Sequence, residues 1–405
     1  MFLILPFGVL SGYLTVAVAY LLSRSGITVE QIASLVALSF IPHTWKFAWA
    51  PIADVTLSRK SWYVIAAFVT ATGIAAVGAL SGGVSRLPML SAYVLIANVA
   101  VTFLGMAVES LMAYGTPEAL KGRAGGWFQA GNLGGAGLGG GAGLWMAQRL
   151  PAPWMAGAVL AFACLLCCAA LRFVPEPRSA HREGGLLKSL ANVAKDFWSV
   201  ARSRGGFLAL VLCFLPLGSG AAAGLWSAIA PEWHASANVV ALVTGVLGGI
   251  ISAVGCILGG WICDRMDRKS AYAAYGLLQA LCAAAMAIAP RTPAMYVLFT
   301  VLYALILGLT YAGFSAFVLE AMGTGAAATK YNVFASLSNT PIMYMTLIDG
   351  HAHTRFGAGG MMLTEAAFGM LGLLLFAAVV VIARRAAGRG LTPAAGSQAR
   401  SRRSR

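Results

Sequence analysis

The sequence predicts an all-α membrane protein of twelve transmembrane helices, arranged as two pseudo-symmetric six-helix bundles. The 405 residues are 59% hydrophobic and 10% charged, with a mean hydropathy of +0.80, which is too apolar for an ordinary soluble domain. Apolar runs of the roughly 20 residues that cross a bilayer follow one another along the chain. Leu5-Pro6-Phe7-Gly8 returns 210 positions later as Leu215-Pro216-Leu217-Gly218, and such an internal repeat predicts two copies of one module.

The predicted spans divide evenly between the two copies. In chain order they cover residues 2–22, 31–53, 62–82, 88–112, 124–147, 153–174, 207–230, 236–262, 270–289, 294–319, 329–349 and 361–383. The opening run lacks a basic n-region and a small-residue cleavage site, so we interpret it as the first span rather than a signal peptide. The chain therefore begins inside a span.

The distribution of Lys and Arg predicts the orientation in the membrane. With a cytoplasmic amino terminus, the inner loops and the tail carry 22 of the 28 Lys and Arg residues and the outer loops carry five. Positive charge marks cytoplasmic loops, so both termini are expected in the cytoplasm. The net charge of +15 sits in loops, which argues against a nucleic-acid partner. Richness in Ala, Gly and Arg favours a bacterial inner membrane.

Composition divides the chain into four segments. We expect an amino-terminal six-helix bundle over 1–174, a cytoplasmic linker over 175–205, a carboxyl-terminal six-helix bundle over 206–383, and a disordered basic tail over 384–405. Apolar residues recur at helical spacing within the linker. They predict an amphipathic helix that either lies on the inner membrane surface or packs under the bundle. The tail is a candidate for contact with anionic lipid.

The fifth predicted span is dense in glycine. Its ten glycines are Gly125, Gly126, Gly131, Gly134, Gly135, Gly137, Gly139, Gly140, Gly141 and Gly143. Glycines at four-residue spacing allow helix backbones to approach closely. We favour close packing over a flexible, gating helix.

A charged motif marks one inner loop in each half. The pattern Gly260-x-x-x-Asp264-Arg265-x-x-Arg268-Lys269 resembles the signature loop of the major facilitator superfamily. A degenerate copy has Asp54 at offset 210, followed by Arg59-Lys60. The resemblance implies a cytoplasmic gate that holds the two halves together, because a carboxylate at a helix end can pair with a neighbouring cation and release it when helices part. The gate candidates are Asp54, Arg59, Lys60, Asp264, Arg265, Arg268, Lys269 and Glu320.

Two ionisable residues within spans are candidates for the solute or proton path. Lys46 lies deep in the second span, where a lysine costs roughly 2.5–3.5 kcal/mol, and its repeat position holds Cys256. This asymmetry favours a specific task, such as binding an anion or pairing with a titrating carboxylate, although snorkelling also explains it. Glu109 recurs as Glu320 at offset 211, so it is either a gate counter-ion or a coupling residue. Asn98 and Glu109 fall near one helix face.

Further residues carry weaker signals. The polar and aromatic residues most suited to a cavity are Tyr13, Asn98, Gln129, Asn132, Trp226, Tyr311 and Asn339, and each could equally satisfy a neighbouring helix. Asp349, His351, His353 and Arg355 gather at the outer end of the eleventh span. His-x-His could bind a metal or titrate, but solvated side chains are the simpler interpretation, and we predict no metal site. Glu365 is expected to pair with Arg355.

The segment from Trp45 to Asp54, with Arg59-Lys60-Ser61-Trp62, is similar to the second-helix region of AmpG-like muropeptide permeases. These belong to a wider group of peptide, acetyl-CoA and drug transporters, and related siderophore importers share this pattern. The resemblance implies proton-driven import into the cytoplasm.

The sequence thus predicts a monomeric secondary transporter whose partners are a small-molecule solute, protons and the lipid bilayer. Drug or metabolite efflux by proton antiport is the alternative, although the fifth span lacks the Gly-Pro pair typical of antiporters. A non-transporting sensor is a third possibility. No Gly-x-Ser-x-Gly, His-Glu-x-x-His or P-loop pattern occurs, which argues against an enzyme or an ATP-driven pump. No cofactor is expected.

Overall fold

The computed structural model describes residues 1–81, 84–115, 121–175, 191, 194–195, 198, 201–202, 204–322 and 333–389. Over these ranges the chain is helical and contains no strand. Eight of the described helical stretches are long and apolar enough to cross a membrane. The last of them, Val333–Ile382, has 50 residues, enough for two crossings of roughly 20 residues each. The predicted all-α membrane fold is confirmed.

The amino-terminal half, residues 1–175, contains the first set of helices. They are η1 (Phe2–Ile4), α1 (Leu5–Gly12), η2 (Tyr13–Val18), α2 (Ala19–Arg24), α3 (Val29–Val55), α4 (Arg59–Leu80), η3 (Val84–Arg86), α5 (Leu87–Gly115), α6 (Lys121–Gly137), η5 (Leu138–Ala142), α7 (Gly143–Arg149), α8 (Trp154–Leu166) and η6 (Cys167–Phe173). The first six predicted spans all fall on these elements.

The carboxyl-terminal half, residues 204–389, contains the second set. They are α10 (Arg204–Leu212), η7 (Ala221–Leu225), α11 (Trp226–Ile229), η8 (Ala230–Trp233), α12 (Ala237–Val240), η9 (Ala241–Leu247), α13 (Gly248–Cys263), α14 (Arg268–Ile288), α15 (Pro293–Met322) and α17 (Asn339–Arg389). Most of the predicted amphipathic linker helix lies outside the described residues. Helix α17 continues to Arg389, past the Arg384 at which the sequence places the start of the tail.

Polar residues begin the long helices where the chain turns between crossings. Thr28 and Gln31 form a reciprocal capping box at the start of α3, Ser58 caps α4, and Asp267 caps α14 by accepting from the Ser270 backbone N–H at 3.0 Å. Each cap satisfies an amide that has no partner within the helix. We call the end with the Asp264–Lys269 loop the inner end, and the end with the turns at Gly26 and Thr292 the outer end.

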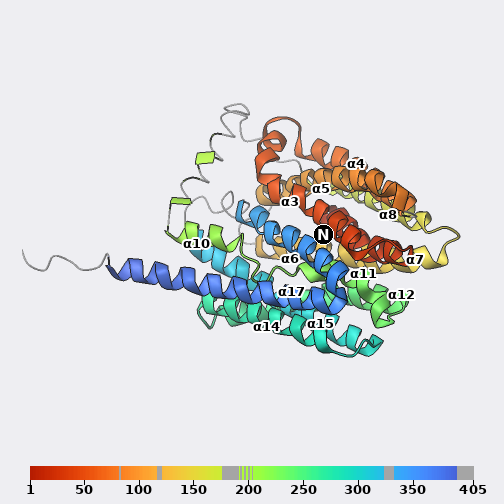
Figure 1. Cartoon of the computed structure of the whole chain (residues 1–405). Coiled ribbons are helices and arrows are strands. Elements are labelled where there is room, and N and C mark those ends of the chain that lie inside the picture. Colours follow the sequence, from red (N-terminus) through yellow and green to blue (C-terminus); the bar gives the residue numbers. More distant parts are fainter. Residues whose placement is uncertain are drawn as a thin grey trace, which may run out of the picture.

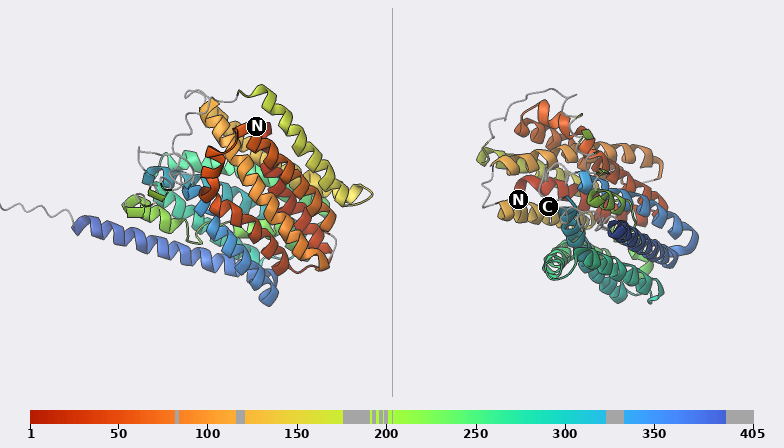
Figure 2. Two further views of the ribbon diagram at one scale, coloured as in Figure 1. Left: turned by 90° about the horizontal axis from the view of Figure 1, so that it is seen from above. Right: turned by 90° about the vertical axis from the view of Figure 1, so that its left-hand side faces the viewer.

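Two glycine-dependent breaks interrupt predicted spans. Gly218 and Gly220 have φ of +66° and +69°, values that side chains other than glycine rarely adopt, and they separate α10 from η7 within the seventh span. Gly357, with φ of +67°, turns the chain inside α17, so this element holds the end of the eleventh span and the whole of the twelfth. Figure 2 shows the end of α17 extending beyond the other helices.

Glycine also sets how closely α1 packs against α6. A Cβ added to Gly8 would overlap the carbonyl oxygen of Asn132, and one added to Gly12 would overlap that of Ala136. From the other side, a Cβ on Gly135 would overlap the carbonyl oxygen of Leu5. Only hydrogen at these positions permits backbone-to-backbone contact. The packing interpretation of the fifth span is confirmed at the glycines that face α1.

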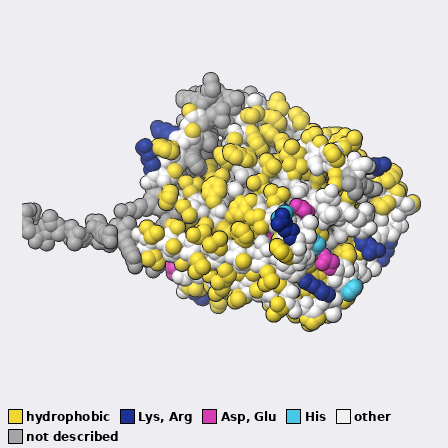
Figure 3. Space-filling view, viewed as in Figure 1, with side chains coloured by type: hydrophobic (Ala, Val, Ile, Leu, Met, Phe, Trp, Pro, Cys, Tyr) yellow, Lys and Arg dark blue, Asp and Glu magenta, His cyan; other side chains and the backbone are white. Residues whose placement is uncertain are grey.

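The two halves meet along several helices. In Figure 1 the red-to-yellow helices of the amino-terminal half lie mostly above the green-to-blue helices of the carboxyl-terminal half. Helix α3 packs along α17, Ser23 Oγ donates to the Ala228 carbonyl at 2.6 Å, and η5 packs on η9. Hydrophobic side chains cover much of the face seen in Figure 3, as expected of a surface that contacts lipid.

Candidate solute and proton path

Lys46 of α3 and Glu109 of α5 form an ion pair inside the amino-terminal half. Lys46 Nζ lies 3.7 Å from Glu109 Oε1, and the two side chains are 19% and 33% exposed. The positions Val29–Val55 and Leu87–Gly115 place both residues on long helices that pack together. The structure therefore unites the two ionisable candidates that the sequence singled out separately.

Two further polar contacts tie α3 to α5. The His43 ring donates from Nε2 to Asn98 Oδ1 at 3.2 Å, and Trp49 Nε1 donates to Thr102 Oγ1 at 3.1 Å. With the ion pair they form a polar ladder, which we define as His43, Lys46, Trp49, Asn98, Thr102 and Glu109. In a bilayer such contacts satisfy groups that lipid cannot. The sequence predicted Asn98 as a candidate but not His43 or Trp49. Each of these two residues lies three positions from Lys46, a spacing that places residues near one another on a helix.

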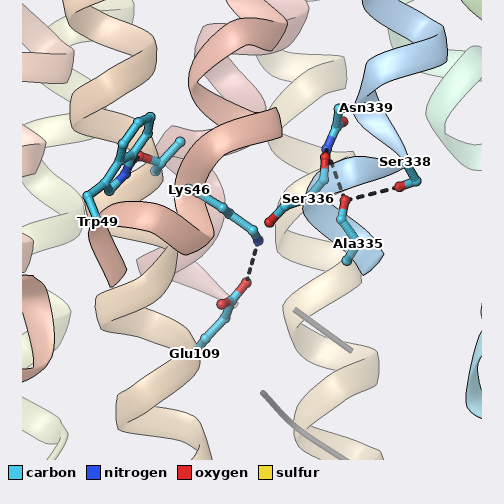
Figure 4. A network of polar contacts seen from close by, with 8 residues as sticks. Lys46, Trp49, Glu109, Ala335, Ser336, Ser338 and Asn339 are labelled. Atoms are coloured by element: carbon cyan, nitrogen blue, oxygen red, sulfur yellow. Dashed lines mark hydrogen bonds and ion pairs between the residues drawn. The ribbon is translucent and has the colours of Figure 1, made fainter. Parts of the chain in front are cut away.

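Within this ladder, Lys46 faces the other half of the molecule (Figure 4). Figure 4 shows the Lys46 ammonium between Glu109 and the segment of Ser336 and Asn339. Asn339 Nδ2 donates to the carbonyl oxygens of Ala335 and Ser336 at 3.0 and 3.1 Å. One residue after Lys46, Phe47 packs against an apolar cluster of the carboxyl-terminal half. Lys46 thus lies where the two halves meet.

The remaining cavity candidates lie elsewhere. Tyr13 is buried inside the amino-terminal half, with its hydroxyl against Gly78 and Gly157. Trp226 is buried in the carboxyl-terminal half, where its ring meets Tyr303 edge to face at 5.2 Å. Tyr311 is 50% exposed and lines a small cavity of about 40 Å³. Asn132 is partly buried and Gln129 is exposed, both on α6. The structure groups only Asn98 and Asn339 with the Lys46–Glu109 pair.

The predicted gate residues lie at the inner end. Asp264 ends α13 and is exposed. Arg265 turns back on its own helix, donating to the Trp261 carbonyl at 3.0 Å and stacking 3.8 Å from the Trp261 ring centre. The side chains of Asp54 and Glu320 lie outside the described part of the chain. Arg59 and Lys60 begin α4, and Arg268 and Lys269 begin α14, so these cations sit at corresponding turns in the two halves.

At the outer end, two histidines pair with carboxylates rather than with solvent alone. His351 Nδ1 donates to Glu30 Oε1 at 3.1 Å, which joins α17 to α3, and this hydrogen bond lowers the pKa of Glu30. His353 donates to Glu232. Burial raises the pKa of Glu232, but the hydrogen bond and the charges of His353 and Arg291 outweigh it, so that pKa lies below its usual value.

The expected pairing of Glu365 with Arg355 is wrong. Glu365 is 5% exposed and accepts a hydrogen bond from Tyr303 at 2.8 Å. Arg355 is exposed, and its positive charge contributes to lowering the pKa of Glu30. The Gly357 turn explains the difference, because it folds the start of the twelfth span back into the bundle.

Replacing Glu30 with alanine is expected to loosen the outer closure, because the Glu30–His351 bond joins the two halves. Exposed ion pairs contribute little to closure, so outer opening should rise by no more than about fivefold. Labelling of a reporter cysteine at Val36, which is buried and packs against Gly224, would measure it. Glu232→Ala is the matched control, since Glu232 and His353 belong to the same half. Equal labelling in both variants would contradict the expectation.

Long apolar helices arranged in two packed halves define a multi-pass membrane protein. A model of the Major Facilitator Superfamily matches residues 1–345. The chain therefore belongs to the major facilitator superfamily.

Solved structures of transporters share the fold. The nucleoside transporter NupG has a TM-score of 0.70 and 13% identity over 94% of this chain and 97% of its own. The xylose transporter XylE from E. coli, in a partially occluded inward-open conformation, has a TM-score of 0.66 and 16% identity over 92% and 95%. A POT family transporter in complex with a thioalcohol-conjugated peptide has a TM-score of 0.69 and 12% identity over 95% of each chain. No curated protein sequence matches the chain.

Proposed function

We propose that the protein is a proton-coupled secondary transporter that imports a medium-sized polar solute, such as a muropeptide or siderophore, by alternating access. The observation that carries this proposal is the ion pair of Lys46 and Glu109 at 3.7 Å, placed opposite the Ser336–Asn339 segment (Figure 4). Ionisable residues within membrane spans are expensive and usually mark a substrate or ion path.

The pair supplies a chemical switch. While Glu109 is a carboxylate, it neutralises Lys46. A proton on Glu109, or an anionic group of the solute near Lys46, weakens this attraction and leaves the other partner free to bind. Because Lys46 lies where α3 meets the other half, the change alters contacts that must break in alternating access.

Orientation and assembly belong to the proposal as well. The excess of Lys and Arg in the loops of the inner end supports a cytoplasmic location for that end and for both termini. We place the protein as a monomer in a bacterial inner membrane. Glu109 has the role of a coupling residue here, since its partner is Lys46, and not that of a gate counter-ion.

Weakening the inner gate is expected to shift the transporter in the opposite direction from Glu30→Ala. Asp264→Asn and Asp54→Asn remove carboxylates proposed to hold the inner ends together, so labelling of the Val36 reporter should fall, by up to about fivefold for exposed charges. Asp267→Asn is the control, because asparagine also caps helices well. Unchanged labelling in both gate variants would count against the gate.

The function is tested by adding candidate solutes to intact cells and following external pH. Muropeptides, siderophores and drugs form the panel. Alkalinisation that depends on the solute and on expression supports proton symport inward, while acidification would favour efflux by antiport. No pH change and no uptake with any of them would favour a sensor and overturn the proposal.

A further inference from the structure

A second group of polar side chains lies deep in the carboxyl-terminal half, away from the Lys46–Glu109 pair. Asp349 and Glu365 lie on α17 on either side of the Gly357 turn, and they are 0% and 5% exposed. Tyr303 of α15 and Ser219 of the break before η7 complete the group. We call Asp349, Glu365, Tyr303 and Ser219 the carboxyl cluster.

One oxygen of Glu365 is well supplied with donors. Glu365 Oε1 accepts from Tyr303 Oη at 2.8 Å and from Ser219 Oγ at 3.4 Å. Gln279 Nε2 in turn donates to Tyr303 at 2.8 Å, and Thr310 donates to Gln279 Oε1 at 3.2 Å. Donors of this kind stabilise a carboxylate, so Glu365 is prepared to hold negative charge.

The other carboxyl oxygens have no donor. Both oxygens of Asp349 and Oε2 of Glu365 are buried without a hydrogen-bond partner among the described residues. The two carboxyl groups are close enough to interact with each other. Over the same part of the chain, no ion pair links either group to Lys, Arg or His.

This arrangement requires a bound cation or a proton. Two ionised carboxylates can only accept hydrogen bonds, and a buried charge without a partner is too costly to persist, so the group neutralises instead. A single proton removes both difficulties, because it turns one carboxyl into a donor for the other. Metal coordination would need further oxygen ligands, whereas Tyr303 and Ser219 direct hydrogens at Glu365.

We propose that Asp349 and Glu365 form a second proton-binding site of the transport cycle, in addition to the proton switch at Glu109. The bound proton resides on Asp349, and the protonated Asp349 carboxyl donates a hydrogen bond to the Glu365 carboxylate. Glu365 also accepts hydrogen bonds from Tyr303 and Ser219. Binding takes one proton from water and changes the pair from two negative charges to one. The assignment of this proton to the transport cycle rests on the proposed function, whereas proton binding does not.

The broken seventh span places this site beside a small cavity. Gly218 and Ser219 line the cavity of about 40 Å³ that Tyr311 and Thr310 also line, which is room for at least one water molecule. Irregular backbone within a membrane is tolerated where it lines a cavity, and discontinuous helices form the ion sites of other transporter folds. Ser219 therefore connects the cavity to Glu365.

The two carboxyl groups are particular to one half. At the offset of 210, the positions that correspond to Ser219, Asp349 and Glu365 hold Val9, Gly139 and Met155, whereas Tyr303 corresponds to Tyr93. A general requirement of the six-helix bundle would be expected in both copies. As with Lys46, the departure from the repeat indicates a specific task.

Infrared spectroscopy of the full chain in lipid nanodiscs tests proton binding without a solute. We expect a carboxylic-acid C=O band at neutral pH that disappears as the pH is raised. Asp349→Asn and Glu365→Gln should each abolish it, because an amide N–H supplies the missing donor and leaves the remaining carboxyl ionised. Asp267→Asn, which changes an exposed carboxyl at the start of α14, should leave the band in place.

Several results would overturn the proposal. The first is absence of the band from the wild-type protein, a result that does not depend on the folding of any variant. The second is persistence of the band in a folded Asp349→Asn protein. The third is loss of the band when sodium is added at constant pH, which would indicate a sodium site. The external pH assay separates the two proposals. If solute drives external alkalinisation but the infrared band is absent, proton binding by the carboxyl cluster is rejected and the proposed function stands. If the band is present but no solute changes the external pH, the proposed function is rejected, and with it the role of the cluster in the transport cycle.

Discussion

Replacing Lys46 with methionine is expected to reduce solute-driven external alkalinisation at least about tenfold. The change keeps an unbranched side chain that is one atom shorter, but it leaves Glu109 without the cation 3.7 Å away. Truncating one partner of a buried charge pair costs about 2–5 kcal/mol. Because Glu109 is 33% exposed, we take the lower end of this range, and about 1.4 kcal/mol already corresponds to tenfold.

The reciprocal variants separate coupling from folding. Glu109→Gln should reduce alkalinisation similarly, and the double variant Lys46→Met with Glu109→Gln should regain thermal stability without regaining proton-linked uptake. Lys195→Met, at an exposed lysine of the linker, provides a matched change of charge outside the path. Alkalinisation at the wild-type rate in folded Lys46→Met protein would remove Lys46 from the coupling mechanism.

The helix pattern of this chain was predictable because hydrophobic length is a property of the sequence alone. Successive apolar runs determine where the helices lie, and Thr28, Ser58 and Asp267 cap three of them. The breaks within spans were harder to predict from the sequence. Gly218 and Gly357 resemble the many glycines that serve close packing, and only the folded backbone separates the two uses of glycine.

The candidate site was predictable in its charged members but not in its partners. A lysine or a glutamate within an apolar span stands out at once, so Lys46 and Glu109 were found. Their pairing depends on how α3 lies against α5, which no local pattern contains. Glu365 was misplaced for the same reason, because its neighbours Tyr303 and Ser219 lie 62 and 146 residues away along the chain.

The contact between α1 and α6 provides the largest expected effect on folding. In Gly12→Ala the new methyl group would overlap the carbonyl oxygen of Ala136, which belongs to a helix backbone and cannot rotate away. Overpacking against side chains costs about 1–3 kcal/mol, and a backbone neighbour leaves less room for adjustment. We expect a lower yield of folded protein and a lower melting temperature, measured by size-exclusion chromatography after heating in detergent.

Gly134→Ala is the matched control in the neighbouring helix. It introduces the same methyl group on α6, where nothing lies within 4 Å of the new Cβ, and alanine is about 0.8–1 kcal/mol better than glycine in a helix. Its melting temperature should therefore equal or exceed that of the wild-type protein. If Gly12→Ala melts as Gly134→Ala does, the two backbones are not in the contact described here. A lower melting temperature in Gly12→Ala together with an unchanged or higher one in Gly134→Ala would show that the effect of a methyl group at this helix contact depends on which atoms face the glycine.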